Sequence, residues 1–333
     1  MRLLFTCLVA LGVLAGCEGN AEDPDAGNPM RPDSGLFDAG PPVIVYSQYT
    51  LRTNGWPSGA RVVGAGVLDN ALFVATDQGV VALPVTQTSW IPVTTPLMGD
   101  VKPTSLQRID QNLVMTAAGA SSGGVYLRGF DSSDWTSVSS PPNPTWSLVK
   151  KSNEYLLATT GGLYRADSLS GQWTRRSLMN TALFTQPIGR FVAAPSQQKI
   201  FATNLTGPLF ESTDVGINWV ASVPRGNVEA LAANGAVVLV STVMDGQVRS
   251  DNYGNTFRDA GTPIADGVSV YAIQGADFWA GGNGGIKRSI DNGQTFTDAN
   301  DGLPSGTAVR ALFFAGNYVI ADTAAGPYIN QLE

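Results

Sequence analysis

Short hydrophobic segments alternate with turn-forming residues from residue 43 to the end of the chain. Lys199–Thr203 and Val237–Val243 are typical, because each is rich in β-branched or aromatic residues and lies between turn formers. No segment keeps the 3.6-residue apolar period of an amphipathic helix. The pattern predicts an all-β protein made of many short strands.

Three octapeptides share the template S-x-D/N-x-G-x-[TN]-W/F. They are Ser212–Trp219, Ser250–Phe257 and Ser289–Phe296. The aromatic residues that close them lie 38 and then 39 residues apart. A repeat of this length is typical of an array of small sheets, in which each unit packs against its neighbours.

Weaker copies of the template precede these three and also end in an aromatic residue. The closing aromatics are then Trp90, Trp135, Trp173, Trp219, Phe257 and Phe296, with separations of 45, 38, 46, 38 and 39 residues. This spacing predicts six complete units of about four strands each.

A seventh unit is split between the two ends of the chain. Val309–Phe314, Asn317–Asp322 and Gly326–Asn330 supply three strands, and Val43–Tyr49 precedes the first full unit without partners of its own. We expect Val43–Tyr49 to become the outer strand of the last unit, because this pairing removes two exposed sheet edges. Residues 43–333 are therefore predicted to form a seven-bladed β-propeller of four-stranded antiparallel blades.

The octapeptide resembles the Asp-box, or BNR repeat, of sialidases, sortilin-type receptors, xyloglucanases and photosystem II assembly-factor propellers. In that family the box joins the two outer strands of a blade, far from the catalytic face. The resemblance implies a structural role, with a carboxylate or amide that accepts backbone hydrogen bonds, a glycine with positive φ and a buried aromatic ring. The residues in these positions are Ser212, Asp214, Gly216, Trp219, Ser250, Asn252, Gly254, Phe257, Ser289, Asp291, Gly293 and Phe296. One carboxylate per turn supplies too few oxygens for calcium, so no metal site is expected there.

A binding site is expected on the face around the central channel. Aligning the blades on their second strands, anchored on Val238, places one residue per inner strand at the channel mouth. These residues are Val63, Thr104, Trp146, Phe191, Glu229, Tyr271 and Arg310. Aromatic faces with a few polar groups suit a sugar or a peptide side chain, so Trp146, Glu229, Tyr271 and Arg310 are the candidate ligand-binding residues. The alternative is that the seven side chains only fill a narrow channel.

Catalytic groups are scarce. The chain has no histidine, and its two cysteines, Cys7 and Cys17, both lie in the N-terminal leader. The Arg-Ile-Pro motif of sialidases is missing. Glycoside hydrolysis needs two carboxylates about 5–10 Å apart. Among the mouth residues only Glu229 is a carboxylate, and Asp266, in the loop before the strand of Tyr271, could be the second. We assign no catalytic residue, and a glycosidase or polysaccharide lyase acting on extracellular glycans stays the alternative function.

The N-terminus has the features of an exported, anchored protein. Residues 1–16 form a short apolar run after one arginine, which is typical of a signal peptide. Leu14–Cys17 resembles a bacterial lipobox, which implies lipid attachment at Cys17, whereas the alternative is an ordinary secretory signal. Residues 17–42 are acidic and rich in Pro and Gly, which predicts a disordered tether. Glu18 favours the outer membrane over the inner one.

Charge excludes one class of partner. The net charge of −7 and the isoelectric point near 4.7 argue against nucleic acid, which binds clustered Lys and Arg. The sequence therefore predicts a monomeric, non-catalytic binding or assembly protein without a cofactor, attached to the membrane only through its lipid. Its partners would be proteins or surface glycans, bound at the mouth or, in a third possibility, along the outer blade edges.

Overall fold

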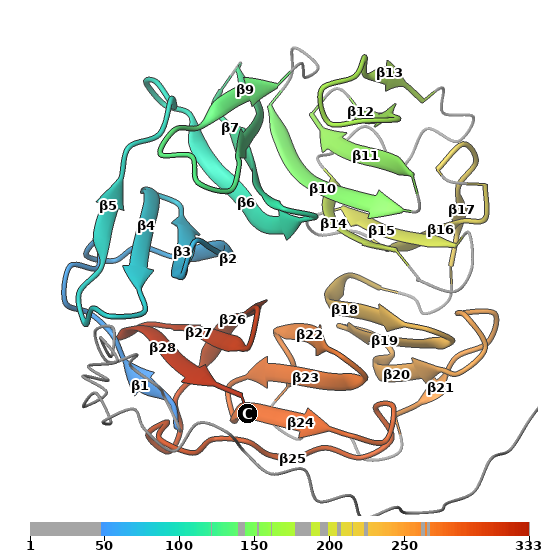
Figure 1. Ribbon diagram of the computed structural model, residues 1–333. Helices are drawn as coiled ribbons and strands as arrows, with labels where there is room; N and C mark the ends of the chain where they lie inside the picture. The colour runs from blue at the N-terminus through green and yellow to red at the C-terminus, as the bar shows by residue number, and fades with distance from the viewer. Residues whose placement is uncertain are drawn as a thin grey trace, which may run out of the picture. The chain divides into compact units, whose positions relative to one another are not determined.

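Seven four-stranded antiparallel sheets stand around a central axis in the part of the chain that the computed structural model describes (Figure 1). The described residues are 48–120, 122–138, 144–151, 153–160, 162–176, 188–193, 199–204, 208–214, 216–222, 226–260, 264 and 267–332, with backbone alone for 188–193 and 204. The predicted signal peptide, Cys17, the tether and Val43–Ser47 lie outside them. No helix among the described residues is long and apolar enough to cross a membrane.

Each of the first four blades follows the chain from its inner to its outer strand. Blade 1 has β2 (Val62–Leu68), β3 (Ala71–Thr76), β4 (Gly79–Pro84) and β5 (Ile91–Val93). Blade 2 has β6 (Lys102–Ile109), β7 (Asn112–Ala118), β8 (Gly123–Arg128) and β9 (Thr136–Val138). Blade 3 has β10 (Thr145–Lys151), β11 (Glu154–Thr159), β12 (Gly162–Ala166) and β13 (Thr174–Arg175). Blade 4 has β14 (Ile188–Ala193), β15 (Ile200–Asn204), β16 (Leu209–Ser212) and β17 (Val220–Ala221).

The last blade is the one that uses both ends of the described chain. Blade 5 has β18 (Val228–Asn234), β19 (Val237–Thr242), β20 (Gly246–Ser250) and β21 (Arg258–Asp259). Blade 6 has β22 (Val270–Gln274), β23 (Asp277–Gly282), β24 (Gly285–Ser289) and β25 (Thr297–Asp298). Blade 7 has β26 (Val309–Ala315), β27 (Tyr318–Thr323) and β28 (Gly326–Gln331), completed by β1 (Thr50–Leu51). The predicted seven-bladed propeller, closed by an N-terminal outer strand, is confirmed.

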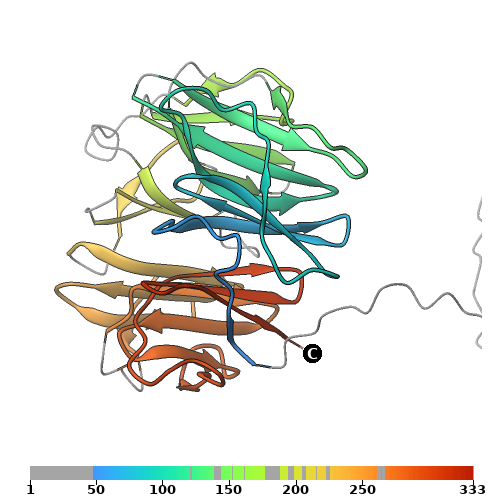
Figure 2. The ribbon, with the colours of Figure 1, turned by 90° about the vertical axis from the view of Figure 1, so that its left-hand side faces the viewer.

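The position of the closing strand differs from the prediction. The prediction placed it at Val43–Tyr49, whereas the strand that pairs with β28 is Thr50–Leu51 (Figure 2). Thr50 lies opposite Ile329. Tyr49 instead precedes the strand, and its N–H donates to the carbonyl of Asp301 at 2.8 Å. The physical reason is the repeat itself, because a closing aromatic stands directly before the outer strand in each of the other blades.

Tyr49 is the closing aromatic of blade 7. The core is divided into clusters between neighbouring blades, and each described cluster contains one closing aromatic of the later blade. In chain order these are Trp90, Trp135, Trp173, Trp219, Phe257 and Phe296, and Tyr49 takes this place between blades 6 and 7. Tyr49 is 3% exposed. The buried ring therefore anchors the seam in the same way that the other aromatics anchor the remaining interfaces.

The three strong Asp-boxes have the hydrogen bonds expected of a tight turn. In blade 6 the carboxylate of Asp291 accepts the N–H groups of Gln294 and Thr295 at 3.0 and 2.9 Å, and Ser289 Oγ accepts Gly293 N–H at 2.8 Å. The boxes of blades 4 and 5 repeat the serine contact, and in both the side chain of Asp214 or Asn252 accepts the N–H four residues further on. The glycines at 216, 254 and 293 have φ of 78°, 77° and 75°.

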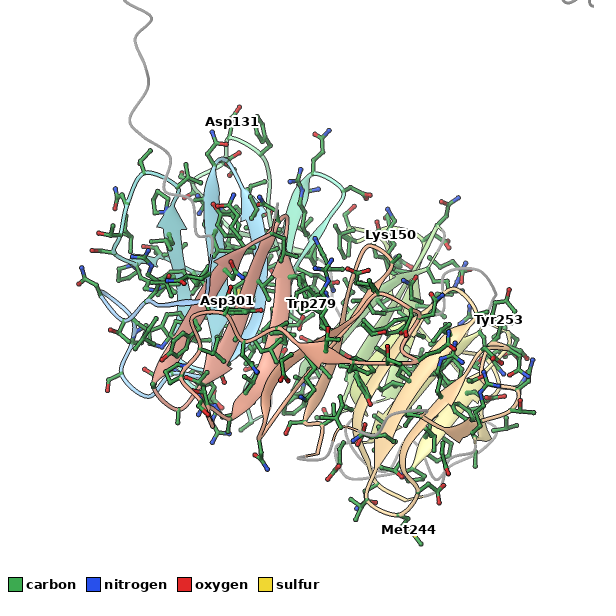
Figure 3. All side chains as sticks on the ribbon, turned by 90° about the horizontal axis from the view of Figure 1, so that it is seen from below. Asp131, Lys150, Met244, Tyr253, Trp279 and Asp301 are labelled. Atoms are coloured by element: carbon green, nitrogen blue, oxygen red, sulfur yellow. The ribbon has the colours of Figure 1, made fainter. Side chains whose placement is uncertain are left out.

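The antiparallel order gives the propeller two distinct faces. The mouth face bears the loops between blades and the loops between second and third strands. The hairpin face bears the hairpins between first and second strands and the Asp-box turns. Figure 3 shows the two at opposite ends, with Met244 of a mouth-face loop away from Asp131 of a hairpin-face turn.

Candidate functional site

A β-bulge marks the start of the inner strand in six of the seven described blades. The register shifts leave one residue of each strand without a cross-strand partner. These residues are Val63, Thr104, Trp146, Gly189, Glu229 and Arg310. A bulge redirects the side chain of its extra residue, and here it lies where the inner strand leaves the mouth face. The flanking residues point into the cores, as the buried Val228 and Ala230 do on either side of Glu229.

The structure brings three of the four predicted binding residues to this ring. Trp146, Glu229 and Arg310 are bulged residues of blades 3, 5 and 7, together with Val63 and Thr104 of the wider predicted set. Glu229 is exposed and the others are half-buried. Their ligand-binding role stays a prediction.

Tyr271 is not at the mouth, and its predicted position is wrong. It is 6% exposed and packs between blades 5 and 6, with its ring 6.3 Å from that of Phe296. Burial raises the pKa of the Tyr271 hydroxyl above its ordinary value. Phe278 pairs with Ser289 as Val238 pairs with Ser250, so the residue equivalent to Glu229 is Ser269.

Phe191 is also not the residue at the bulge of its blade. It follows the bulged Gly189 by two residues, because the hairpin between β14 and β15 is two residues longer than that of blade 5. The Phe191 side chain lies outside the described residues. Counting back from the box serines, which pair with Ile200, Val238 and Phe278, would have identified the anchor of blade 6.

Bulged side chains contact the second strand of their own blade. Thr104 Oγ1 lies 2.8 Å from Thr116 Oγ1, and Ser241 Oγ donates to Glu229 Oε2 at 3.4 Å. In blades 1 and 3 the equivalent positions are apolar, with Val63 beside Ala75 and Trp146 beside Ala158. The mouth is therefore polar at some blades and apolar at others.

The pair in blade 7 is ionic. Arg310 Nε lies 3.0 Å from Asp322 Oδ2, and Arg310 Nη2 donates to Asp322 Oδ1 at 3.0 Å. The Asp322 side chain is 2% exposed and that of Arg310 is 33% exposed. Burial raises the pKa of Asp322 above its usual value, although Arg310 and the N–H of Val62 act against this shift. The buried carboxylate holds the guanidinium at the rim of the mouth.

Two mouth-face cavities include charged ring residues. Arg310 lines one of about 380 Å³, formed with Thr53, Trp56 and the turn 323–326. Glu229 lines another of about 290 Å³, formed with Val268, Ser269 and Asn283. In the described parts of the chain no three Asp, Glu, Cys or His side chains gather closely enough to hold a metal ion.

Sequence reasoning missed a loop that helps to build the larger cavity. Asn54–Ala60 and Asp301–Thr307 share the pattern N/D-G-x-P-S-G and flank blade 7 on the mouth face. Both close the same turn, with Ala60 N–H donating to Pro57 O and Thr307 N–H to Pro304 O, each at 3.1 Å. The internal repetition of NGWPSG and DGLPSG was the signal available.

Apolar side chains are exposed on the same face. Met98, Val243 and Met244 are 82%, 66% and 74% exposed, in the loops β5–β6 and β19–β20. Flexible methionines are common at surfaces that bind peptides. The mouth face thus combines adaptable apolar contacts with the exposed Glu229 and the arginine that Asp322 holds.

Comparison with known proteins relates this arrangement to solved propellers. A structure of YCF48 bound to D1 peptide matches 88% of this chain and 98% of that chain, at 14% identity and a TM-score of 0.66. The fold is similar to that of YCF48. YCF48 from Cyanidioschyzon merolae matches 86% of this chain and 98% of that chain, at 14% identity and a TM-score of 0.63.

An enzyme with a similar fold is also among the solved structures that match this chain. Catalytically inactive virginiamycin B lyase from Staphylococcus aureus, with quinupristin, covers 86% of this chain and 99% of that chain, at 12% identity and a TM-score of 0.62. No protein-family model and no curated protein matches the sequence. At these identities the likeness to YCF48 and to the lyase establishes the fold alone.

Proposed function

We propose that this chain is a non-catalytic binding or assembly protein whose mouth face holds a segment of a protein partner. The exposed Met98, Val243 and Met244 and the bulged Glu229, all on the mouth face, carry the proposal. The solved YCF48 that binds a D1 peptide has the same fold and supports a peptide as the ligand class. Surface glycans are the other partner class for this face.

The proposal includes a place in the cell. The lipobox at Leu14–Cys17 and the acidic segment that follows support a lipid-anchored propeller displayed outside the cytoplasm. Substitution of Cys17 by Ala should release the protein from membranes on fractionation of the native host. Retention of the Cys17→Ala protein in the membrane fraction would contradict the anchor.

Site-specific cross-linking tests the mouth face directly. A photoreactive amino acid replaces Met244, or in the matched control Ile290, which is 79% exposed on the hairpin face. We expect an adduct with an envelope protein from position 244, weakened by Trp146→Ala, and none from position 290. Equal adducts from both positions, or none from position 244, would refute the mouth-face site.

A glycosidase or polysaccharide lyase is the second candidate function. Glu229 is exposed beside a cavity of about 290 Å³, which supports a role for its carboxylate. The inactive virginiamycin B lyase is a histidine-to-alanine variant, whereas this chain has no histidine, so a reaction here needs other groups. Asp266, the expected second carboxylate, lies outside the described residues. Turnover of a polysaccharide panel that disappears in Glu229→Gln would establish the enzyme.

A further inference from the structure

A third cavity lies on the hairpin face, far from the channel mouth. It has a volume of about 440 Å³ and lies between the hairpin of blade 1 and the outer turn of blade 2. Its lining is Val67, Leu68, Asp69, Asn70, Arg108, Phe130 and Asp131. The volume falls within the range of about 300–1,000 Å³ that small-molecule pockets occupy. Asp131 lies at the end of the propeller opposite to Met244 (Figure 3).

Phe130 stands where the strong Asp-boxes have their turn-holding residue. Counting back five residues from the closing aromatic gives Asp214, Asn252 and Asp291 in blades 4, 5 and 6, and Phe130 in blade 2. Asp131 has φ of 57°, close to the 62° and 61° of Tyr253 and Asn292 at the next box position, so the turn keeps its shape. The ring at position 130 supplies none of the box hydrogen bonds and is 63% exposed. The fold of blade 2 therefore gives no reason for an aromatic residue here.

The neighbouring blade replaces the missing support. Asp131 N–H donates to Asp69 Oδ2 of the blade 1 hairpin at 3.1 Å, which ties the two walls of the cavity together. Arg108 is held from both blades, because its Nη1 donates to Val67 O of blade 1 at 3.5 Å and its Nε donates to Asp110 O of its own blade 2 at 3.1 Å. The exposed ring thus stands beside a cavity whose walls are already positioned.

The chemistry of the lining favours an uncharged ligand with many hydroxyl groups. Asp69 and Asp131 offer acceptors, Arg108 offers donors, and the amide of Asn70 offers both. A cation would meet the guanidinium of Arg108, and an anion would meet two carboxylates. A sugar ring places its C–H face on an aromatic ring and its hydroxyls on such polar groups, as small-ligand pockets commonly combine the two.

We propose that this cavity, with Phe130 as its platform, binds one or two residues of a neutral carbohydrate chain. The site is separate from the mouth face and does not depend on the proposed protein partner. It would let the propeller contact a glycan on one face while the other face holds a peptide.

A test variant, Phe130→Asp, and a matched control, Ile290→Ala, test the proposal. The probe is an array of neutral glucose, galactose, mannose and N-acetylglucosamine oligosaccharides, read with the labelled full chain. Phe130→Asp removes the ring but introduces the carboxylate that the boxes of blades 4 and 6 have, so the fold should be kept. Ile290→Ala removes an apolar side chain that is 79% exposed on the same face but outside the cavity. Thermal unfolding checks that each variant is folded.

The expected result is binding to at least one neutral oligosaccharide that Phe130→Asp and Arg108→Gln weaken at least tenfold. Ile290→Ala and the mouth variant Trp146→Ala should leave it unchanged. Three outcomes overturn the proposal: no binding by the wild-type chain, equal binding by folded Phe130→Asp, or binding that Trp146→Ala abolishes. The last outcome would assign the glycan to the mouth face instead.

Discussion

The N–H of Tyr49 donates to the carbonyl of Asp301 at 2.8 Å, and this contact joins the first described residues to the loop before blade 7. Trp90 makes the equivalent bond to Asn54 O at 2.9 Å one interface later. The two loops that supply these carbonyls have the same sequence pattern. The interface between blades 6 and 7, where the chain closes the propeller, therefore has the same backbone contact as the interface between blades 7 and 1.

Tyr49→Ala should destabilise the propeller strongly. The ring is 3% exposed and packs with Trp279, Leu303 and Tyr328. Truncating a buried aromatic side chain costs about 3–5 kcal/mol, part of it from the cavity that remains. The free energy of unfolding, measured in urea, should fall by this amount.

The matched control is Tyr49→Phe. The Tyr49 hydroxyl is buried and has no hydrogen-bond partner among the described residues, and burial raises its pKa. Removing an unsatisfied buried hydroxyl should leave stability unchanged or raise it slightly. A large loss in Tyr49→Phe would show that the hydroxyl has a partner and would contradict this account of the seam.

Much of the fold follows from the sequence because the repeat is spelled out in local turn chemistry. The box glycines need positive φ and the closing aromatics need burial, so they mark each outer strand wherever the chain places them. The same rule, applied to Tyr49, would have placed the closing strand at Thr50–Leu51 rather than at Val43–Tyr49. The rule that a closing aromatic precedes each outer strand was present in the sequence, but it applies to all seven blades only when Tyr49 is counted as the closing aromatic of blade 7.

The mouth was less predictable, because it depends on the lengths of individual hairpins. Trp146, Glu229 and Arg310 were found since their hairpins share one length, whereas the longer hairpin of blade 4 displaced Phe191. Tyr271 was displaced by a two-residue error in the anchor of its second strand. The exposure of Met98 and Met244 depends on how loops from different blades leave the sheet, which no local pattern records.

Asp291 should make the protein lose stability in acid. Desolvation acts to raise its pKa, but hydrogen bonds from Thr295, Ser289 and Gln294 outweigh it and lower the pKa to about 2. The folded pKa lies below the unfolded value of about 3.9. The stabilising contribution is therefore present above pH 4 and is lost as pH falls from about 4 to 2.

Asp291→Asn should flatten the stability curve in this window, because the neutral amide lacks the contribution that the ionised carboxylate makes above pH 4. Asn252 already fills the same position in blade 5 without a charge, so the turn tolerates the amide. Chemical denaturation at a series of pH values between 2 and 6 measures the effect. An acid dependence of the variant equal to that of the wild type would exclude Asp291 as a source.

Arg310→Ala should destabilise the protein more at neutral pH than at pH 4. Asp322 is 2% exposed, so the variant leaves a buried carboxylate without its cation. Its folded pKa is already raised and should rise further, which means that stability is lost as pH increases from about 4 towards 7. We expect a loss of about 1–3 kcal/mol at pH 7, below that of a fully buried pair because Arg310 is 33% exposed.

The control for this pair is the double variant Arg310→Ala with Asp322→Asn. Removing the second charge should recover part of the lost stability and abolish its pH dependence. Urea unfolding at pH 4 and pH 7 compares the three proteins. A single variant with the same loss at both pH values would indicate lost packing of the arginine stem rather than an uncompensated carboxylate.

Gly293→Ala should cost more stability than Gly235→Ala, although both glycines have positive φ. Gly235 has φ of 57° and open space around it, so its substitution adds only backbone strain of about 1–2 kcal/mol. At Gly293, with φ of 75°, a Cβ would lie 2.8 Å from Leu239 Cδ1 in the preceding blade. Leu239 is completely buried, so it has no free space to move into. Equal losses in urea unfolding would mean that the box turn does not pack against the neighbouring blade as closely as this distance requires.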